Sequence, residues 1–339
     1  MASLSIDIAQ INRFAESIKR FDWVLDTFED PLLYPDKKTG LTLSANFFFF
    51  LAAIDHRTHT DKGTYEGIIN GAKLTGAELM WALAKKRLRE DQTFFSPKRL
   101  SKVSVDEIIN LFQVTEPRPM RIAGPEERTV LLRDCAEKLQ TNFAGSILNA
   151  VSQSGGWLFR EDGQGFLQQL KQFMAYEDPM NKKSFLLVKF LERRHFINIR
   201  DPGNSHVPVD NILLRLAFRT GIVKMIDYDL DRKIRSNEVI SQEQERTLRQ
   251  FTLEAFNKVA LSINMNATHL DDILWEFGRA HCGVPKPVCS TLPGISYQRP
   301  YRMIRSGPIG ECPFGRGCAG YERPKIWELK EPNFKTIYY

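Results

Sequence analysis

The sequence lacks several features that would assign it to common classes of protein. Among its 339 residues no apolar run approaches the roughly 20 residues that span a bilayer, and the apolar run at 47–54 is much shorter. The first residues lack the basic, apolar and small-residue regions of a secretory signal, so we expect a cytoplasmic protein with reduced cysteines. No internal repeat or low-complexity tract is evident, which excludes a repeat architecture.

The sequence also has no convincing alternation of polar and apolar residues, which is the pattern of a half-buried strand. A period of 3.6 dominates instead and indicates amphipathic or buried helices. These predicted helices cover 11–21, 79–88, 105–112, 130–151, 166–174, 184–196, 211–223, 242–263 and 269–279. Because 42% of the residues are hydrophobic, the chain can bury the core of one large or two intimate domains. We therefore expect an all-α fold.

The chain carries a modest excess of positive charge. Its formal net charge of +6 is compatible with a polyanionic partner, although such an excess is also common in proteins that bind no nucleic acid. Basic residues crowd two stretches, 85–102 and 299–325. They suit contacts with phosphates, and a solvated helix face is an equal interpretation of the first stretch.

Four of the five cysteines lie in the last fifth of the chain. Cys282 and Cys289 are separated by six residues, and Cys312 and Cys318 by five. In a reducing compartment clustered thiols serve a metal more often than disulfides. The spacing therefore predicts a four-cysteine metal site, with two unrelated pairs as the alternative. Cys135 lies on an apolar helix face and is most simply a buried thiol.

One aspartate stands at the start of an apolar helix pattern. Asp210 follows Val207-Pro208-Val209 and precedes apolar residues at helical spacing. A carboxylate there lies at the positive end of the helix dipole, so it can stay charged beside a developing cation. Capping of the helix without a catalytic role is the alternative.

Three segments, in the same order, resemble the helix-hairpin-helix DNA glycosylase superfamily. Residues 207–222 look like its catalytic-aspartate helix, and 182–191 like the helix with its Schiff-base lysine. Residues 269–286 are similar to the C-terminal helix of the archaeal 8-oxoguanine DNA glycosylase family. The resemblance implies a two-lobed helical fold with the active site in the cleft between the lobes.

The same resemblance implies roles for individual residues. Asp210 becomes the catalytic charge and Lys182 or Lys183 the nucleophile, since register favours Lys182 and the Lys-Ser pair favours Lys183. Asp271 and Trp275 match the pair that holds the extruded base, and they share a helix face one turn apart. A tryptophan packed in the core beside a capping aspartate is the alternative. His56 and Tyr65 lie in a segment that resembles the lining of the same cleft and are implied to contact the base.

The cysteine spacing resembles that of the glycosylases related to endonuclease III. Their outer gaps are also six and five residues, whereas their middle gap is two and here it is 22. With the leader 278–282, this resemblance implies that Cys282, Cys289, Cys312 and Cys318 bind a 4Fe-4S iron–sulfur cluster, with zinc as the alternative. We therefore expect a two-lobed glycosylase domain over 1–281 and a cysteine-rich metal-binding tail over 282–339.

A second family, the queuosine-salvage N-glycosylases, is similar over nearly the whole chain. The similarity covers 71–112, 142–146 and the terminal 337–339. This chain has Pro208 where those enzymes have an aromatic residue, and Asp272 and Glu276 where they have tyrosine and aspartate.

Three functions follow from these patterns. Our first expectation is a monomeric DNA glycosylase, with or without lyase activity, that excises an oxidised purine such as 8-oxoguanine from double-stranded DNA. The alternative is an N-glycosidase that releases queuine from the small nucleotide queuosine 5′-phosphate. A non-catalytic nucleic-acid-binding relative is the third interpretation, and no membrane partner is expected.

Overall fold

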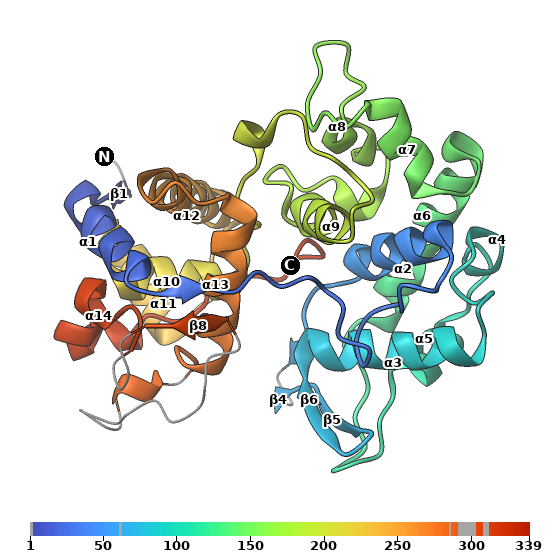
Figure 1. The fold of residues 1–339 in the computed structure, drawn as a ribbon. Helices are drawn as coiled ribbons and strands as arrows, with labels where there is room; N and C mark the ends of the chain where they lie inside the picture. The colour runs from blue at the N-terminus through green and yellow to red at the C-terminus, as the bar shows by residue number, and fades with distance from the viewer. Residues whose placement is uncertain (1–2, 61–62, 285, 291–302, 308–311) are drawn as a thin grey trace. The chain divides into compact units, whose positions relative to one another are not determined.

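The protein folds into two compact units, each formed by segments that are distant in sequence. The structure, a computed structural model, describes residues 3–60, 63–284, 286–290, 303–307 and 312–339. Unit 1 comprises Met1–Asp26 and Ser205–Lys335, and unit 2 comprises Thr27–Asn204 and Thr336–Tyr339. Helices dominate both units, as the 3.6 period predicts (Figure 1). Within the described ranges no helix is long and apolar enough to cross a bilayer.

Unit 2 is built around helix α2. Its helices are α2 (Leu41–Ala53), α3 (Gly76–Glu90), α4 (Pro97–Leu100), α5 (Val105–Phe112), α6 (Pro125–Phe143), α7 (Ile147–Ser154), α8 (Phe166–Leu170) and α9 (Lys182–Arg193), with short 3-10 turns η1 (Met174–Tyr176) and η2 (Pro202–Asn204). α2 packs against α6, α7 and α9. Because every residue of α2 from Ser44 to Ala53 is buried, this helix is apolar all round and forms the centre of the unit.

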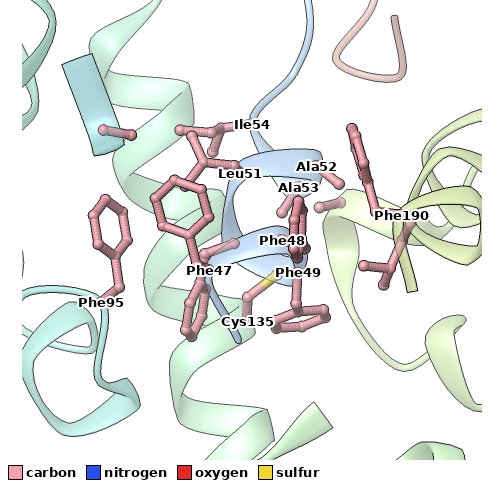
Figure 2. Packing of buried hydrophobic residues seen from close by; sticks show 14 of the residues in the cluster. Phe47, Phe48, Phe49, Leu51, Ala52, Ala53, Ile54, Phe95, Cys135 and Phe190 are labelled. Atoms are coloured by element: carbon pink, nitrogen blue, oxygen red, sulfur yellow. The ribbon is translucent and has the colours of Figure 1, made fainter. Parts of the chain in front are cut away.

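Aromatic side chains fill the core of unit 2. Phe48 stacks on Phe190 of α9 with ring centroids 5.1 Å apart, and Phe47 meets Phe95 edge to face at 5.1 Å (Figure 2). Such pairs add a geometric preference to the large apolar area that aromatic rings bury. Cys135 on α6 lies in the same core, as the buried thiol that the sequence predicts.

Unit 1 is organised around helix α10. Its helices are α1 (Ile8–Lys19), α10 (Asn211–Thr220), α11 (Tyr228–Ser236), α12 (Gln242–Ser262), α13 (Ala267–Ala280) and α14 (Ala319–Glu322), with 3-10 turns η3 (Val288–Ser290), η4 (Gly315–Gly317) and η5 (Pro324–Glu328). α10 packs against α12, α13 and α14. The helix that begins beside Asp210 is therefore a central element of its unit.

Helices α10 and α13 approach closely at a glycine. A Cβ atom on Gly278 would lie 2.3 Å from Cγ2 of Ile212, so only glycine fits there without a shift. Arg215 donates to the carbonyl of Gly278 at 2.7 Å, and Arg219 one turn later donates to the carbonyl of Cys282 at 3.0 Å. These contacts hold α10 against the C-terminal end of α13 and the residues that follow it.

The strands are short, and the sequence does not reveal them. Four antiparallel pairs form, β1 (Leu4–Ile6) with β7 (Val223–Met225), β2 (Asp22–Trp23) with β8 (Ile304–Ser306), β3 (His59–Thr60) with β4 (Gly63–Thr64), and β5 (Glu66–Ile69) with β6 (Ala72–Thr75). The expectation of a chain without strands is thereby corrected. Strands of two to four residues are too short for polar and apolar alternation to stand out.

The cysteine-bearing residues belong to unit 1. Residues up to Lys335 are part of unit 1, and the last four residues are part of unit 2. The physical reason is a set of buried contacts with α10. Arg219 donates to the carbonyls of Trp327 and Leu329 at 2.9 and 3.0 Å, which holds these residues against the helix.

Candidate functional site

Asp210 is the N-cap of α10. Its Oδ1 accepts a hydrogen bond from the backbone N–H of Leu213 at 3.0 Å, and its own backbone is extended. The carboxylate therefore has the capping role that such a position favours. Its Oδ2 has no hydrogen-bond donor among the described residues, which leaves this oxygen for a ligand at the positive end of the helix.

The segment before Asp210 is tied to α12. The buried Arg249 donates from Nη2 to the carbonyl of Val209 at 3.3 Å. The side-chain oxygen of Asn257 accepts from the N–H of Val207 at 3.4 Å. Two side chains of one helix thus fix the backbone that leads into the N-cap, so the position of the carboxylate is set by the fold of unit 1.

Asp271 and Trp275 lie on α13 within the same unit. Asp271 is buried, and Trp275 is part-buried with the guanidinium of Arg279 5.1 Å from the centre of its ring. Being one turn apart, they share a helix face. α13 packs against α10, the helix that begins beside Asp210.

In unit 2, the ring of His56 lies between two buried basic side chains. Nζ of Lys183 is 3.2 Å from its Nδ1, and Nη1 of Arg128 is 3.3 Å from its Nε2. The exposed fractions of His56, Arg128 and Lys183 are 2%, 0% and 0%. Burial, together with the charge of Arg128, holds the pKa of His56 well below its usual value, so the ring is neutral.

The positions of the protons follow from this geometry. A guanidinium can only donate, so Nε2 of His56 accepts from Arg128. The neutral ring then carries its hydrogen on Nδ1 and donates it to Nζ of Lys183, while that amine donates to the carbonyl of Ala53. Only a neutral amine can accept in this way. Burial, followed by the charges of Lys182 and Arg128, likewise lowers the pKa of Lys183 far below its usual range.

The two candidate lysines have different surroundings at the start of α9. The side chain of Lys183 is enclosed, whereas Lys182 keeps 8% of its surface exposed. The backbone N–H of Lys182 donates to the buried carboxylate of Asp178 at 2.8 Å. Both lysines occupy the first turn of the helix.

Tyr65 belongs to the core of unit 2. Its side chain is 1% exposed, and its hydroxyl donates to the carbonyl of Phe112. Burial raises the pKa of this hydroxyl well above its usual value. Tyr65 and His56 thus both have hydrogen-bonding partners inside unit 2, and the base contacts that the sequence resemblance implies for them stay a prediction.

The four C-terminal cysteines line one cavity in unit 1. Its wall includes Arg219 of α10 beside the cysteines. Cys282 and Cys312 are buried, and Cys289 and Cys318 are part-buried. Thiol groups that are far apart in the sequence are therefore gathered around one space, and the metal site itself stays a prediction.

These thiols influence one another. Burial, and next the neighbouring Cys282, raise the pKa of Cys289 to about 11 and that of Cys318 to about 12. Without a cation the buried groups are thus neutral thiols. In the described part of the chain no three His, Cys, Asp or Glu side chains are arranged to hold a metal ion. The four sulfur donors surround the cavity instead, and sulfur is the donor that iron–sulfur clusters take.

Arg219 links this cavity to α10. Its side chain is 1% exposed, and its Nη1 donates to the carbonyls of Cys282 and Gly283 at 3.0 and 2.8 Å. The same nitrogen lies 3.6 Å from Sγ of Cys282. The remaining nitrogens donate to Trp327 and Leu329. One arginine thus joins Cys282 and Gly283 to the later residues Trp327 and Leu329 of unit 1.

The basic stretches give limited support to a DNA partner. In the first, Lys85 is buried and paired with Asp36 at 2.8 Å, and Arg99 pairs with Glu107. In the second, two of the arginines, Arg299 and Arg302, lie outside the described residues. These two basic side chains of the first stretch thus form ion pairs within unit 2.

Comparison with known proteins favours one of the two family resemblances. Residues 34–195 match the family model described as queuosine salvage protein. The match includes most of unit 2 with Lys182 and Lys183, and it ends before Asp210 and the four cysteines. No curated protein matches the chain. These findings support the queuosine-salvage alternative rather than the DNA repair glycosylase that the sequence first suggests.

Sequence reasoning missed the buried arginines. Arg128, Arg215, Arg219 and Arg249 have exposed fractions of 2% or less. Charged side chains are almost never fully buried unless they are paired, so each marks a position where the fold satisfies a cation internally. Arg215 and Arg219 carried a visible signal, since they lie one turn apart within an otherwise apolar helix pattern.

Proposed function

We propose that the protein is an N-glycosidase of the queuosine-salvage type, which hydrolyses the bond between the base and the sugar of a nucleotide. The match of residues 34–195 to the queuosine salvage family carries this proposal. The substrate is queuosine 5′-phosphate and the released base is queuine. Asp210 at the start of α10 supplies the charge that the reaction needs.

The chemistry follows from the properties of a carboxylate at this position. As the bond between C1′ and the base nitrogen breaks, the electron pair leaves with the base and positive charge develops on the sugar. Asp210 stabilises that charge through Oδ2 and orients a water molecule towards C1′. The water oxygen bonds to C1′, and the proton that it loses is passed on to the departing base.

Two residues of α13, in the same unit as Asp210, are proposed to hold the base. Asp271 accepts hydrogen bonds from the edge of the base, and Trp275 stacks on it, since both share one face of α13. Lys183 keeps its neutral amine on His56 and Ala53 and positions the start of α9. Water, rather than an amine, is then the nucleophile.

A DNA glycosylase is the second candidate. The gathering of four cysteines around one cavity favours it, because the cysteine spacing resembles that of the endonuclease III relatives. On this proposal the substrate is double-stranded DNA with an oxidised purine, and Lys182 is the amine that attacks the sugar.

For either function we propose that Cys282, Cys289, Cys312 and Cys318 hold a metal cofactor. Four buried or part-buried sulfur donors around one cavity suit a 4Fe-4S cluster, with zinc as the alternative. When bound, such a group supplies cross-links between the C-terminal residues of unit 1 and compensates for the buried thiolate charges.

Replacement of Asp210 tests the proposal. Asp210→Asn should retain the fold because asparagine caps a helix about as well as aspartate. The rate of queuine release should fall on the order of 10² to 10³ because the charge is lost. The matched control is Asp227→Asn, which alters an exposed N-cap aspartate of α11 in the same unit and should leave the rate unchanged. Wild-type release by the Asp210→Asn variant would remove Asp210 from the mechanism.

A further inference from the structure

Arg219 is a buried cation whose partners are unusual. Its neighbour one turn earlier, Arg215, is equally buried but forms an ion pair with Glu331. No carboxylate in the described ranges lies within ion-pair distance of Arg219, whose guanidinium donates to four backbone carbonyls and to Sγ of Cys282. An enclosed cation needs a nearby negative charge, because desolvation of an unpaired charge is costly.

The cavity beside Arg219 contains groups that can supply this charge. Its four cysteines become thiolates when they bind a metal, since the thiolate is the ligand form. Four thiolates exceed the charge of a bound cluster or zinc ion, so the loaded site is negative overall. A guanidinium in the wall offsets part of that excess.

Arg219 contacts two of the four cysteines, one through its side chain and the other through its backbone carbonyl. Its guanidinium lies 3.6 Å from Sγ of Cys282, and its carbonyl lies 3.4 Å from Sγ of Cys318. Cys282 follows α13, and Cys318 follows η4. One residue at the end of α10 thus contacts both halves of the ligand set, although 36 positions separate these two cysteines in the sequence.

The opposite end of the same helix is the proposed catalytic end. α10 extends from Asn211 to Thr220, with Asp210 as its N-cap. At 1.5 Å per residue, Asp210 and Arg219 lie roughly 14 Å apart along the helix axis. Contacts that order the C-terminal end of this helix therefore also restrain its N-terminal end, because the helix between them is one rigid element.

We propose that Arg219 is the positioning residue of the metal cofactor held by the four cysteines, and that it connects the cofactor to the helix that presents Asp210. The guanidinium offsets the thiolate charge, donates to Sγ of Cys282 and holds the chain at Cys282 and Gly283 against α10. This inference rests on the four-cysteine cofactor proposed above. Loss of the cofactor should therefore loosen α10 as well as the cysteine segments.

The first test measures the cofactor in the full-length protein. The wild type should contain roughly four iron and four sulfide per chain and show the visible absorption of a thiolate-ligated cluster. Arg219→Met should shift the reduction potential of the cluster to more negative values, because the N–H···S contact and the positive charge both favour the reduced form. Arg219→Lys keeps the charge and should shift it less. Arg246→Met, at an exposed arginine of α12, is the control and should leave the potential unchanged.

The second test measures the connection to the helix. Hydrogen exchange of the α10 amides should accelerate when the cofactor is removed from the wild type, and less so for α11. Iron-free and zinc-free wild type with an intact fold would overturn the proposed cofactor, and zinc in place of iron would overturn the cluster. An unchanged reduction potential in both Arg219 variants, or unchanged exchange in α10, would overturn the role of Arg219. If Arg219→Met does not fold, Arg219→Lys decides. Queuine release by the same wild-type sample tests the proposed function separately.

Discussion

Buried basic side chains are the most unusual residues of this protein. In unit 2, Arg128 and Lys183 flank His56, and in unit 1, Arg215 and Arg219 hold the chain around Cys282. Backbone carbonyls accept most of their hydrogen bonds. Each satisfied N–H offsets part of the cost of removing the group from water. Their burial therefore indicates where the fold is most sensitive to substitution.

Neutral His56 should make the free energy of unfolding depend on pH. Its pKa in the folded protein is lowered, whereas in the unfolded chain it lies near 6.5. Below that pH the unfolded chain binds a proton that the folded protein does not. The free energy of unfolding should thus fall as the pH drops below about 6.5, by up to about 1.4 kcal/mol per pH unit.

Urea denaturation between pH 5 and pH 7 measures this contribution. His56→Gln should have a smaller pH slope than the wild type in this range, because the titrating ring is absent. His195→Gln, at an exposed histidine of unit 2, keeps the contribution of His56 and serves as the control. Identical slopes for the wild type and His56→Gln would contradict the assignment of a neutral buried ring.

Chemical trapping should show whether water or a lysine amine is the nucleophile. If water is the nucleophile, borohydride should trap no covalent adduct with a substrate that is nevertheless cleaved. Lys182→Gln should then leave kcat nearly unchanged, since this amine does not attack the sugar. An adduct that disappears in Lys182→Gln would instead establish an amine nucleophile, and the DNA glycosylase proposal would gain.

Asp210 was predictable from the sequence, whereas the surroundings of His56 were not. An aspartate directly before an apolar helix pattern signals an N-cap within one short window. The ring of His56 is neutral because of Arg128 and Lys183, which lie 72 and 127 positions away. Such contacts depend on tertiary packing, and a local pattern contains no information about them.

At the scale of elements, helix prediction succeeds where the 3.6-residue apolar period begins directly after a capping residue. The predicted helix 105–112 has the bounds of α5, whose capping box begins at Ser104. The predicted helix 130–151 is two helices, α6 and α7, because Ala144 ends α6 in a left-handed conformation. Helix α2 was missed because it is apolar on all sides and shows no period.

The close approach of α10 and α13 depends on Gly278. Gly278→Ala would place a Cβ atom 2.3 Å from Ile212 and 3.1 Å from Leu216, so the helices must separate. Overpacking of this kind should lower the free energy of unfolding by about 1–3 kcal/mol in chemical denaturation. The control Gly283→Ala, where the nearest atom is 3.9 Å away, should cost much less. Equal losses would mean that the helices do not depend on this contact.

At the scale of the whole molecule, both units join segments that are distant in the sequence. Gln10 on α1 donates at 2.6 Å to the carbonyls of Thr220 and Gly317, so it joins three parts of unit 1. The sequence predicts an all-helical protein, and it could not predict this grouping, because the joining contacts span more than 200 residues.

The proposed functional residues are divided between the units. Unit 2 contains Lys182 and Lys183 within the stretch that matches the queuosine salvage family, and unit 1 contains Asp210 with the cysteine cavity. The proposed substrate class therefore rests on the family match. The proposed hydrolysis of the bond between base and sugar rests on the carboxylate at the start of α10.

Release of a free base is the most direct measurement of the central claim. The purified wild-type protein is incubated, in parallel and at physiological salt, with queuosine 5′-phosphate and with DNA duplexes that contain 8-oxoguanine or other oxidised purines. Free bases are then detected by mass spectrometry. We predict release of queuine from the nucleotide, greatly reduced in Asp210→Asn, and no release from the duplexes. Excision of an oxidised purine from DNA, with the nucleotide left intact, would contradict the proposed function.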